Sequence, residues 1–160
     1  MYILLQGHNY RYEISEFLKL FSSEFSFIEC SEDFGVNREG ELLVNKLDID
    51  HGPDRVSILT KSQVLKDGQV LYEKELSQDI TLVDYEKKFE KRNKKIDNDI
   101  KTISKRLIQR SMFDYLNERY DANVPWGILT GIRPVKLIHS LMDQGKSDQE
   151  ISDFMKEEYL

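Results

Sequence analysis

The segment RVSILTKSQVLKDGQVLYEKEL, from Arg55 to Leu76, carries the strongest structural signal in this 160-residue chain. Apolar and polar residues alternate on both sides of the pair Asp67-Gly68. An Asp-Gly pair between two such runs is the strongest short-range signal for a β-hairpin. The segment therefore predicts two antiparallel strands, Arg55 to Val64 and Gln69 to Leu76, and with them a sheet.

Three more short runs toward the N-terminus extend this predicted sheet. Tyr2 to Gln6, Phe25 to Cys30 and Glu41 to Asp48 are each rich in apolar residues and too short for a stable helix. Between the first two, Tyr10 to Phe21 places apolar residues at spacings of three and four, which predicts an amphipathic helix. The strand, helix, strand opening favours a small sheet with a helix packed on one face.

The second half of the chain is predicted to be helical. From about Asp84, a possible cap, apolar residues recur at helical spacing with no Gly or Pro before Pro125. This indicates one long helix, or two, with the apolar stripe Phe89, Ile96, Ile100, Ile103, Leu107, Met112 and Leu116. The charged start of the helix, KKFEKRNKKIDNDIK, is predicted to protrude as a solvated stretch before the stripe docks.

Two short helices are expected at the end of the chain. Pro134 suits a first helical turn, and Gly145 stands where a C-terminal cap belongs. Ser147 and Glu150 form a capping-box pattern at the start of the second helix. The apolar faces are predicted to consist of Leu137, Ile138, Leu141 and Met142 in the first helix and Ile151, Phe154 and Met155 in the second.

The predicted fold class is therefore α+β. We expect a small mixed sheet of about five strands with a packed helix, then a long helix and a short C-terminal helical pair. The expected division is an α+β domain at 1–83, a long charged helix at 84–120 and a helical segment at 121–160. The chain stops on Tyr159-Leu160 without a cap, which indicates a boundary within a longer protein, although a natural terminus also fits.

Composition and charge limit the function classes. With 39% hydrophobic and 32% charged residues, the chain can bury a core. Residues 1–86 hold 8 basic and 17 acidic side chains, whereas residues 87–160 hold 15 basic and 12 acidic, so any contact with a polyanion is expected in the second half. No signal peptide and no membrane-spanning apolar run is recognisable, which predicts a soluble, cytoplasmic protein without a membrane partner.

The sequence gives little support for a metal site or a nucleotide-binding site. Cys30 is the only cysteine, so no cluster-binding motif exists, and it is interpreted as a small buried residue that ends a strand. The loop DIDHGPDR offers Asp48, Asp50, His51 and Asp54 to a divalent cation, but its Gly-Pro-Asp sequence favours an ordinary solvated turn. Neither a Gly-rich nucleotide loop nor a hydrolytic triad can be recognised.

The basic stretch from Lys87 to Arg110 contains ten Lys or Arg residues and could neutralise several phosphates. Acidic residues interrupt it and no aromatic stacking platform accompanies it, so a solvated helical face is the preferred interpretation and nucleic acid an unlikely partner. A helix-turn-helix in the final helix pair is disfavoured because its recognition helix, DQEISDFMKEEY, is acidic.

One stretch remains, PWGILTGIRPVK, from Pro125 to Lys136. It places two glycines, Trp126, Arg133 and Lys136 around a helix start, where unpaired N–H groups favour an anion such as a carboxylate. Alternatively, Trp126 and its apolar neighbours are packing residues and Arg133 bonds to backbone carbonyls. Residue types alone leave both interpretations open.

This motif, preceded by Lys105-Arg106-Leu107 and Tyr115-Leu116, resembles the region before the radical-SAM domain in HemZ-type proteins. These are the oxygen-independent coproporphyrinogen III oxidase-like proteins of bacteria, which act in heme and porphyrin biosynthesis. The clear resemblance covers roughly residues 100–145, with only a general likeness before residue 99. It implies an oxidoreductase that decarboxylates propionate groups of a porphyrinogen with S-adenosylmethionine and a [4Fe-4S] cluster.

The chain departs from that family at the decisive point, because it lacks the CxxxCxxC cluster motif. The resemblance therefore implies an N-terminal accessory domain without catalytic residues, metal or cofactor of its own, whose partner is a radical-SAM domain beyond Leu160. The matching residues Trp126, Thr130, Gly131, Arg133 and Lys136 are candidates for contact with that domain or with a carboxylated tetrapyrrole. Two alternatives stay open: an RNA- or polyanion-binding module that uses residues 87–110, and a structural domain that dimerises through its last helices.

Overall fold

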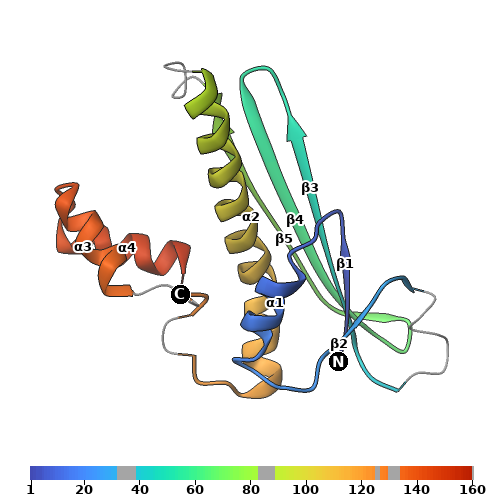
Figure 1. Cartoon of the computed structure of the whole chain (residues 1–160). Helices are drawn as coiled ribbons and strands as arrows, with labels where there is room; N and C mark the ends of the chain where they lie inside the picture. The colour runs from blue at the N-terminus through green and yellow to red at the C-terminus, as the bar shows by residue number, and fades with distance from the viewer. Residues whose placement is uncertain (32–38, 83–88, 125–126, 130–133, 160) are drawn as a thin grey trace.

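Five strands form one mixed sheet in the spatial order β2-β1-β3-β4-β5 (Figure 1). The computed structural model describes residues 1–31, 39–82, 89–124, 127–129 and 134–159, with the backbone alone at 89–94 and 134. β1 pairs in parallel with both β2 and β3, whereas β3, β4 and β5 follow one another antiparallel. The strands are β1 Tyr2–Gln6, β2 Ser26–Ile28, β3 Leu42–His51, β4 Arg55–Lys66 and β5 Gln69–Thr81.

The predicted Asp-Gly hairpin is confirmed. Lys66 pairs with Gln69, so Asp67 and Gly68 alone make the turn, with φ values of 51° and 76°. A two-residue hairpin turn of this kind needs positive φ at both positions, which Asp tolerates and Gly adopts freely. Along β4 every second residue from Val56 to Val64 is buried, which matches the alternation in the sequence.

Two helices cover one face of this sheet (Figure 1). α1, Arg11–Leu18, connects β1 to β2 and buries Ile14, Phe17 and Leu18, as predicted. α2, Phe89–Tyr120, is one helix of 32 residues that packs across β4 and β5. Their apolar residues join those of the inner sheet face in a single hydrophobic cluster, which is the main core. The predicted α+β class and the approximate number of strands are thus confirmed.

The apolar stripe of α2 packs into the core from a point nearer to the start of the helix than predicted. Ile96 and Ile100, within the stretch that was expected to protrude, are only 9% and 8% exposed and belong to the main core. The charged residues around them do not prevent docking, because an isoleucine every fourth residue is enough to keep one face apolar. Farther along, Leu107, Met112 and Leu116 are buried as expected.

The helix pair at the end of the chain confirms its predicted caps. α3, Pro134–Asp143, begins at the proline, and after it Gly145, at φ 80°, and Lys146 donate to the carbonyls of Met142 and Leu141. α4, Asp148–Glu158, has the complete Ser147–Glu150 capping box. A second apolar cluster joins the two helices through Leu129, Leu141, Ile151 and Met155.

Several predicted boundaries and burials are wrong. β3 continues to His51 and β5 to Thr81, because antiparallel partners on β4 extend both pairings past the apolar runs. β2 ends at Ile28, and Cys30 beyond it is half-buried rather than buried. Met142 is 49% exposed, since the α3–α4 contact uses the other side of α3.

Other predictions for the chain stay untested. Asp84 and Phe89 fall on positions whose structure or side chains lie outside the described residues. The division at 83/84 and 120/121 also stays a prediction, although the main core combines residues of the strands, α1 and α2. Among the described residues, no helix is both long and apolar enough to cross a membrane.

A polar network lies inside the core where α2 crosses the sheet. The Asn45 side chain is fully buried and donates to Thr60 Oγ1 at 3.1 Å and to Ser62 Oγ at 2.8 Å. Ser62 Oγ lies 2.6 Å from Ser111 Oγ on α2. Because each buried polar group left without a partner costs about 1–3 kcal/mol, this network favours one position of α2 along the sheet.

His8 connects the network to the start of α1. Its Nε2 donates to Asn45 Oδ1 at 2.9 Å, which leaves Nδ1 to accept from the N–H of Tyr10, the N-cap of α1, at 3.3 Å. Burial lowers the pKa of His8, and the hydrogen bond to Asn45 opposes that effect only in part. The neutral imidazole is therefore the form that fits both partners.

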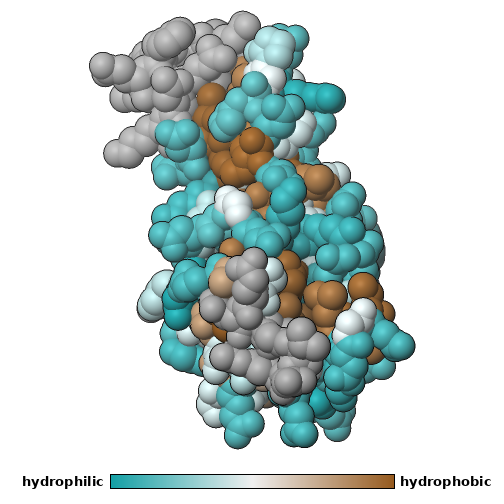
Figure 2. Space-filling view, turned by 90° about the vertical axis from the view of Figure 1, so that its right-hand side faces the viewer, coloured by the Kyte–Doolittle hydropathy of each residue, from teal (hydrophilic) through white to brown (hydrophobic). Residues whose placement is uncertain are grey.

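Figure 2 shows the side of the molecule opposite to α3 and α4. Hydrophilic side chains dominate the visible surface and separate several smaller apolar patches. At the hairpin end, Val70 and Leu71 are 53% and 49% exposed, next to an irregularity in the pairing of β4 with β5. Single exposed apolar residues of this kind are common on protein surfaces.

Gly7 is expected to be the glycine most sensitive to substitution. It has φ 75°, and a Cβ there would lie 2.2 Å from the backbone oxygen of Leu47. Gly7→Ala should lower the free energy of unfolding by roughly 3 kcal/mol or more, measured by urea denaturation. Gly68→Ala is the control, since Gly68 has a similar φ and nothing within 4 Å of its Cβ, and should cost only about 1–2 kcal/mol. Equal losses would contradict the proposed clash.

His8 should make the stability depend on pH. Because its pKa is lower in the folded state than the ordinary 6.5, the unfolded chain binds the proton first as the pH falls. Relative to His8→Gln, the wild-type chain should therefore lose stability as the pH drops from about 6.5 through the lowered pKa. Urea denaturation at a series of pH values measures this difference, with His139→Gln on α3 as control. If the stability of the wild type and of His8→Gln depended on pH in the same way, the lowered pKa of His8 in the folded state would be refuted.

Candidate functional site

A groove of about 810 Å³ lies between α1, α2 and the C-terminal part of the described chain. One wall comes from Tyr12 on α1 and Leu20 just after it, and the floor from Thr102 and Gln109 on α2. The other wall is formed by residues 127–129 and by Tyr159 at the end of α4. Its size and mainly apolar lining fall within the range of ligand-binding sites.

One hydrogen bond holds the wall that includes Tyr159 together, and two contacts attach it to α2. The N–H of Ile128 donates to the Tyr159 carbonyl at 2.9 Å. Arg106 forms an ion pair with Glu158 at 2.6 Å and also donates to Gln78 on β5 at 2.6 Å. Arg110 donates to the carbonyl of Glu157. These contacts hold the end of α4 beside the long helix, as Figure 1 shows.

The charged residues in the groove are largely paired with one another. Lys105 contacts Glu13 at 2.5 Å, and the hydrogen bond from Lys105 lowers the pKa of the Glu13 carboxyl. Arg106, whose side chain is only 16% exposed, is paired with Glu158. Glu16, also in the lining, is paired with Lys19. Both cations among the described lining residues are therefore already paired within the domain.

The motif at 125–136 reaches this groove through its central residues. Gly127, Ile128 and Leu129 are buried and line the groove, so this part of the motif packs against the domain. Lys136 is exposed in the first turn of α3. Trp126, Thr130, Gly131 and Arg133 lie outside the described residues, and their predicted contacts stay predictions.

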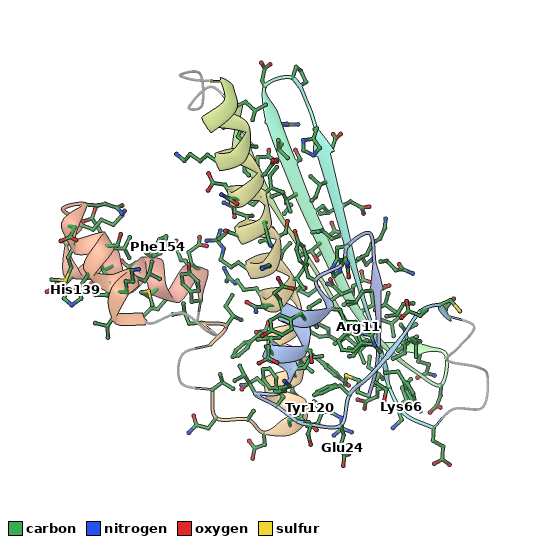
Figure 3. All side chains as sticks on the ribbon, in the orientation of Figure 1. Arg11, Glu24, Lys66, Tyr120, His139 and Phe154 are labelled. Carbon is green, nitrogen blue, oxygen red and sulfur yellow. The ribbon has the colours of Figure 1, made fainter. Side chains whose placement is uncertain are left out.

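The acidic segment at 48–54 is not a preformed metal site. Asp48 and Asp50 lie in β3 rather than in a loop, and Asp48 pairs with Lys46 at 2.7 Å. Within the described residues, no group of three or more His, Cys, Asp or Glu is placed to hold a metal ion. His139 lies on α3, far from the sheet, whose strand β3 carries His51 (Figure 3).

Three basic residues of α2 that were considered for polyanion binding are used within the domain, whereas Lys101 is exposed. Lys105 and Arg106 pair with Glu13 and Glu158, and Arg110 binds the end of α4. A phosphate backbone would have to compete with these contacts. The geometry therefore gives no support to the polyanion alternative at Lys105, Arg106 and Arg110.

A second cleft, of about 600 Å³, lies at the N-terminal end of the molecule, where Glu24 and Tyr120 are close together in Figure 3. Arg119 donates to both carboxylate oxygens of Glu41 there, at 3.1 and 3.2 Å. The N-terminal ammonium donates to the carbonyl of Glu24. These internal contacts account for Arg119, Glu41 and the N-terminal ammonium.

Sequence reasoning missed the outer wall of the groove. Tyr12 and Leu20 fall on the polar side of the predicted helix and are 74% and 43% exposed. Their spacing of eight residues, with Glu16 midway, was a usable signal, because residues four apart lie on the same side of a helix. The Arg106–Glu158 pair could not be found this way, since its partners are 52 positions apart in the sequence.

Comparisons with known proteins add little. No model of a protein family matches the chain, and no curated protein matches it. Among solved structures, the chain is similar to the hypothetical protein CT253 from Chlamydia trachomatis, with 13% identity and a TM-score of 0.38, over 72% of this chain and 95% of that one. A likeness of this degree decides nothing about function.

Arg106 is expected to hold the end of α4 on the domain. Arg106→Ala removes both the Glu158 ion pair and the Gln78 hydrogen bond, and should lower the free energy of unfolding by about 1–3 kcal/mol. Amide hydrogen exchange in α4 should become faster, because the helix loses this attachment. Lys101→Ala, an exposed cation on the same helix, should change stability by less than about 0.5 kcal/mol. Unchanged exchange in α4 would contradict this role.

Proposed function

We propose that this chain is the N-terminal accessory domain of a cytoplasmic, HemZ-type radical SAM protein of heme biosynthesis. The proposal rests on the resemblance of PWGILTGIRPVK to that family. One structural observation supports it: the N–H of Ile128, in the middle of the motif, binds the carbonyl of Tyr159. This bond couples the motif directly to the point from which a following domain would continue.

In this proposal the chain supports a reaction that is carried out elsewhere in the protein. A [4Fe-4S] cluster needs several cysteine thiolates, and this sequence has only Cys30, so its residues do not fit that group. Cluster and S-adenosylmethionine would belong to the following domain, which would decarboxylate the propionates of a coproporphyrinogen-like substrate. Arg133 and Lys136 would act as contacts with that domain or with a substrate carboxylate.

The cheapest test is the reading frame beyond Leu160. We expect a CxxxCxxC segment within the next few dozen residues. After anaerobic reconstitution, the longer protein should show the electron paramagnetic resonance signal of a reduced [4Fe-4S] cluster, which the 160-residue chain should lack. A continuing reading frame without these cysteines would refute the proposal.

Arg133 and Lys136 can be tested in the same protein. Arg133→Ala or Lys136→Ala should lower kcat/KM for coproporphyrinogen III by about tenfold or more, because each removes a charge-assisted contact. Lys146→Ala, an exposed cation between α3 and α4, is the control and should leave kcat/KM unchanged. Normal activity of both motif variants would remove these residues from the proposed site while leaving the cluster test unaffected.

A further inference from the structure

The hydrogen bonds around His8 leave only one arrangement of its proton. The hydroxyl of Thr60 donates to the carbonyl of Lys46 at 3.0 Å, so Thr60 Oγ1 can only accept the bond from the Asn45 side chain, at 3.1 Å. This contact keeps Asn45 Nδ2 toward Thr60 and Asn45 Oδ1 toward His8. His8 Nε2 must then carry the proton, and Nδ1 is the unprotonated nitrogen that accepts from the Tyr10 amide.

A second proton on His8 breaks this arrangement at one point. An imidazolium donates from both nitrogens, so Nε2 keeps its bond to Asn45 Oδ1. Nδ1, however, would present an N–H to the N–H of Tyr10, with 3.3 Å between the two nitrogens. Two donors that face each other repel, and both lose a hydrogen-bond partner at a half-buried position. The bond to the core therefore survives protonation, whereas the bond to α1 is lost.

The first turn of α1 depends on this bond more than the rest of the helix does. Ile14, Phe17 and Leu18, farther along the helix, are at most 1% exposed and anchor it in the main core. The N-cap residue Tyr10 makes no side-chain capping bond that could hold the turn in place of His8. A helix of eight residues is too short to be stable by itself, so a turn that loses its tertiary contact frays.

The surroundings of His8 come from three elements. β3 contributes the neutral Asn45, and the start of α1 contributes the Tyr10 ring, at 5.5 Å between ring centroids. From α2, Lys105 lies over the Tyr10 ring at 5.7 Å and pairs with Glu13 at 2.5 Å. The hydrogen bond from Lys105 lowers the pKa of Glu13 below its ordinary 4.5, so this carboxylate is still ionised at about pH 5.

We propose that His8 is a pH-sensitive switch for the first turn of α1, Tyr10 to Glu13, and that its protonation frees this turn while the rest of the core stays folded. Tyr12 and Glu13 line the groove, so the switch acts on one wall of that site. Burial lowers the pKa of His8 while the turn is closed, and a freed imidazole returns toward the ordinary 6.5, so acid favours the open turn. The switch does not depend on the reaction or the partner in the proposed function.

Amide hydrogen exchange, resolved by residue with NMR between about pH 8 and pH 5, tests the switch. The reporters are the amides of Tyr10, which donates to His8, and of Ile14, which donates to the Tyr10 carbonyl at 3.0 Å. Their protection factors, corrected for the intrinsic effect of pH on exchange, should fall by about tenfold or more as His8 is protonated. The Lys19 amide, bonded to the Ser15 carbonyl at the other end of α1, is the matched control and should change by less than about twofold.

The ring resonances of His8 in the same samples give its pKa, and the loss of protection should have its midpoint there. His8→Gln, which stays neutral at every pH, should remove the loss. Constant protection of Tyr10 and Ile14 across the His8 titration would overturn the switch, and so would a loss that persists in His8→Gln. An equal loss at Lys19 would also overturn it, because the whole helix would then open. If His8→Gln does not fold, the comparison of midpoints in the wild type decides.

Discussion

The rest of the structure depends on the packing of α2 across the inner face of the sheet. Its buried residues from Ile96 to Leu116 cover β4 and β5, whose inner side chains would otherwise be exposed to water. Each Å² of apolar surface buried in this contact contributes about 25 cal/mol to the stability of the domain. It also positions the opposite side of α2, which carries Lys105, Arg106 and Arg110, toward α1 and the C-terminal helices.

The polar network under α2 adds specificity to this packing. A purely apolar interface would tolerate a shift of the helix along the sheet, whereas Asn45, Ser62 and Ser111 are satisfied together only in one arrangement. His8 then transmits that arrangement to the start of α1 through Asn45 and the Tyr10 amide. The position of α1, and with it the outer wall of the groove, thus follows from hydrogen bonds in the core.

Long-range ion pairs build the other wall of the groove. Arg106 and Arg110 bind the last residues of α4, and Ile128 joins the motif to the same place. Residues 127–129 of the motif and Tyr159 consequently line the same side of the groove.

The sequence alone determined most of the elements, because they depend on interactions between residues within a few positions of one another. These are the Asp67-Gly68 turn, the Ser147 capping box, the Gly145 cap and the apolar stripe of α2. The single cysteine likewise excluded a cluster in this chain. Strand ends were less predictable, because β3 and β5 are extended by their partners on β4. Only the tertiary structure decided the groove, the network around Asn45 and the Arg106–Glu158 pair, because these join residues far apart in sequence whose proximity no local pattern encodes.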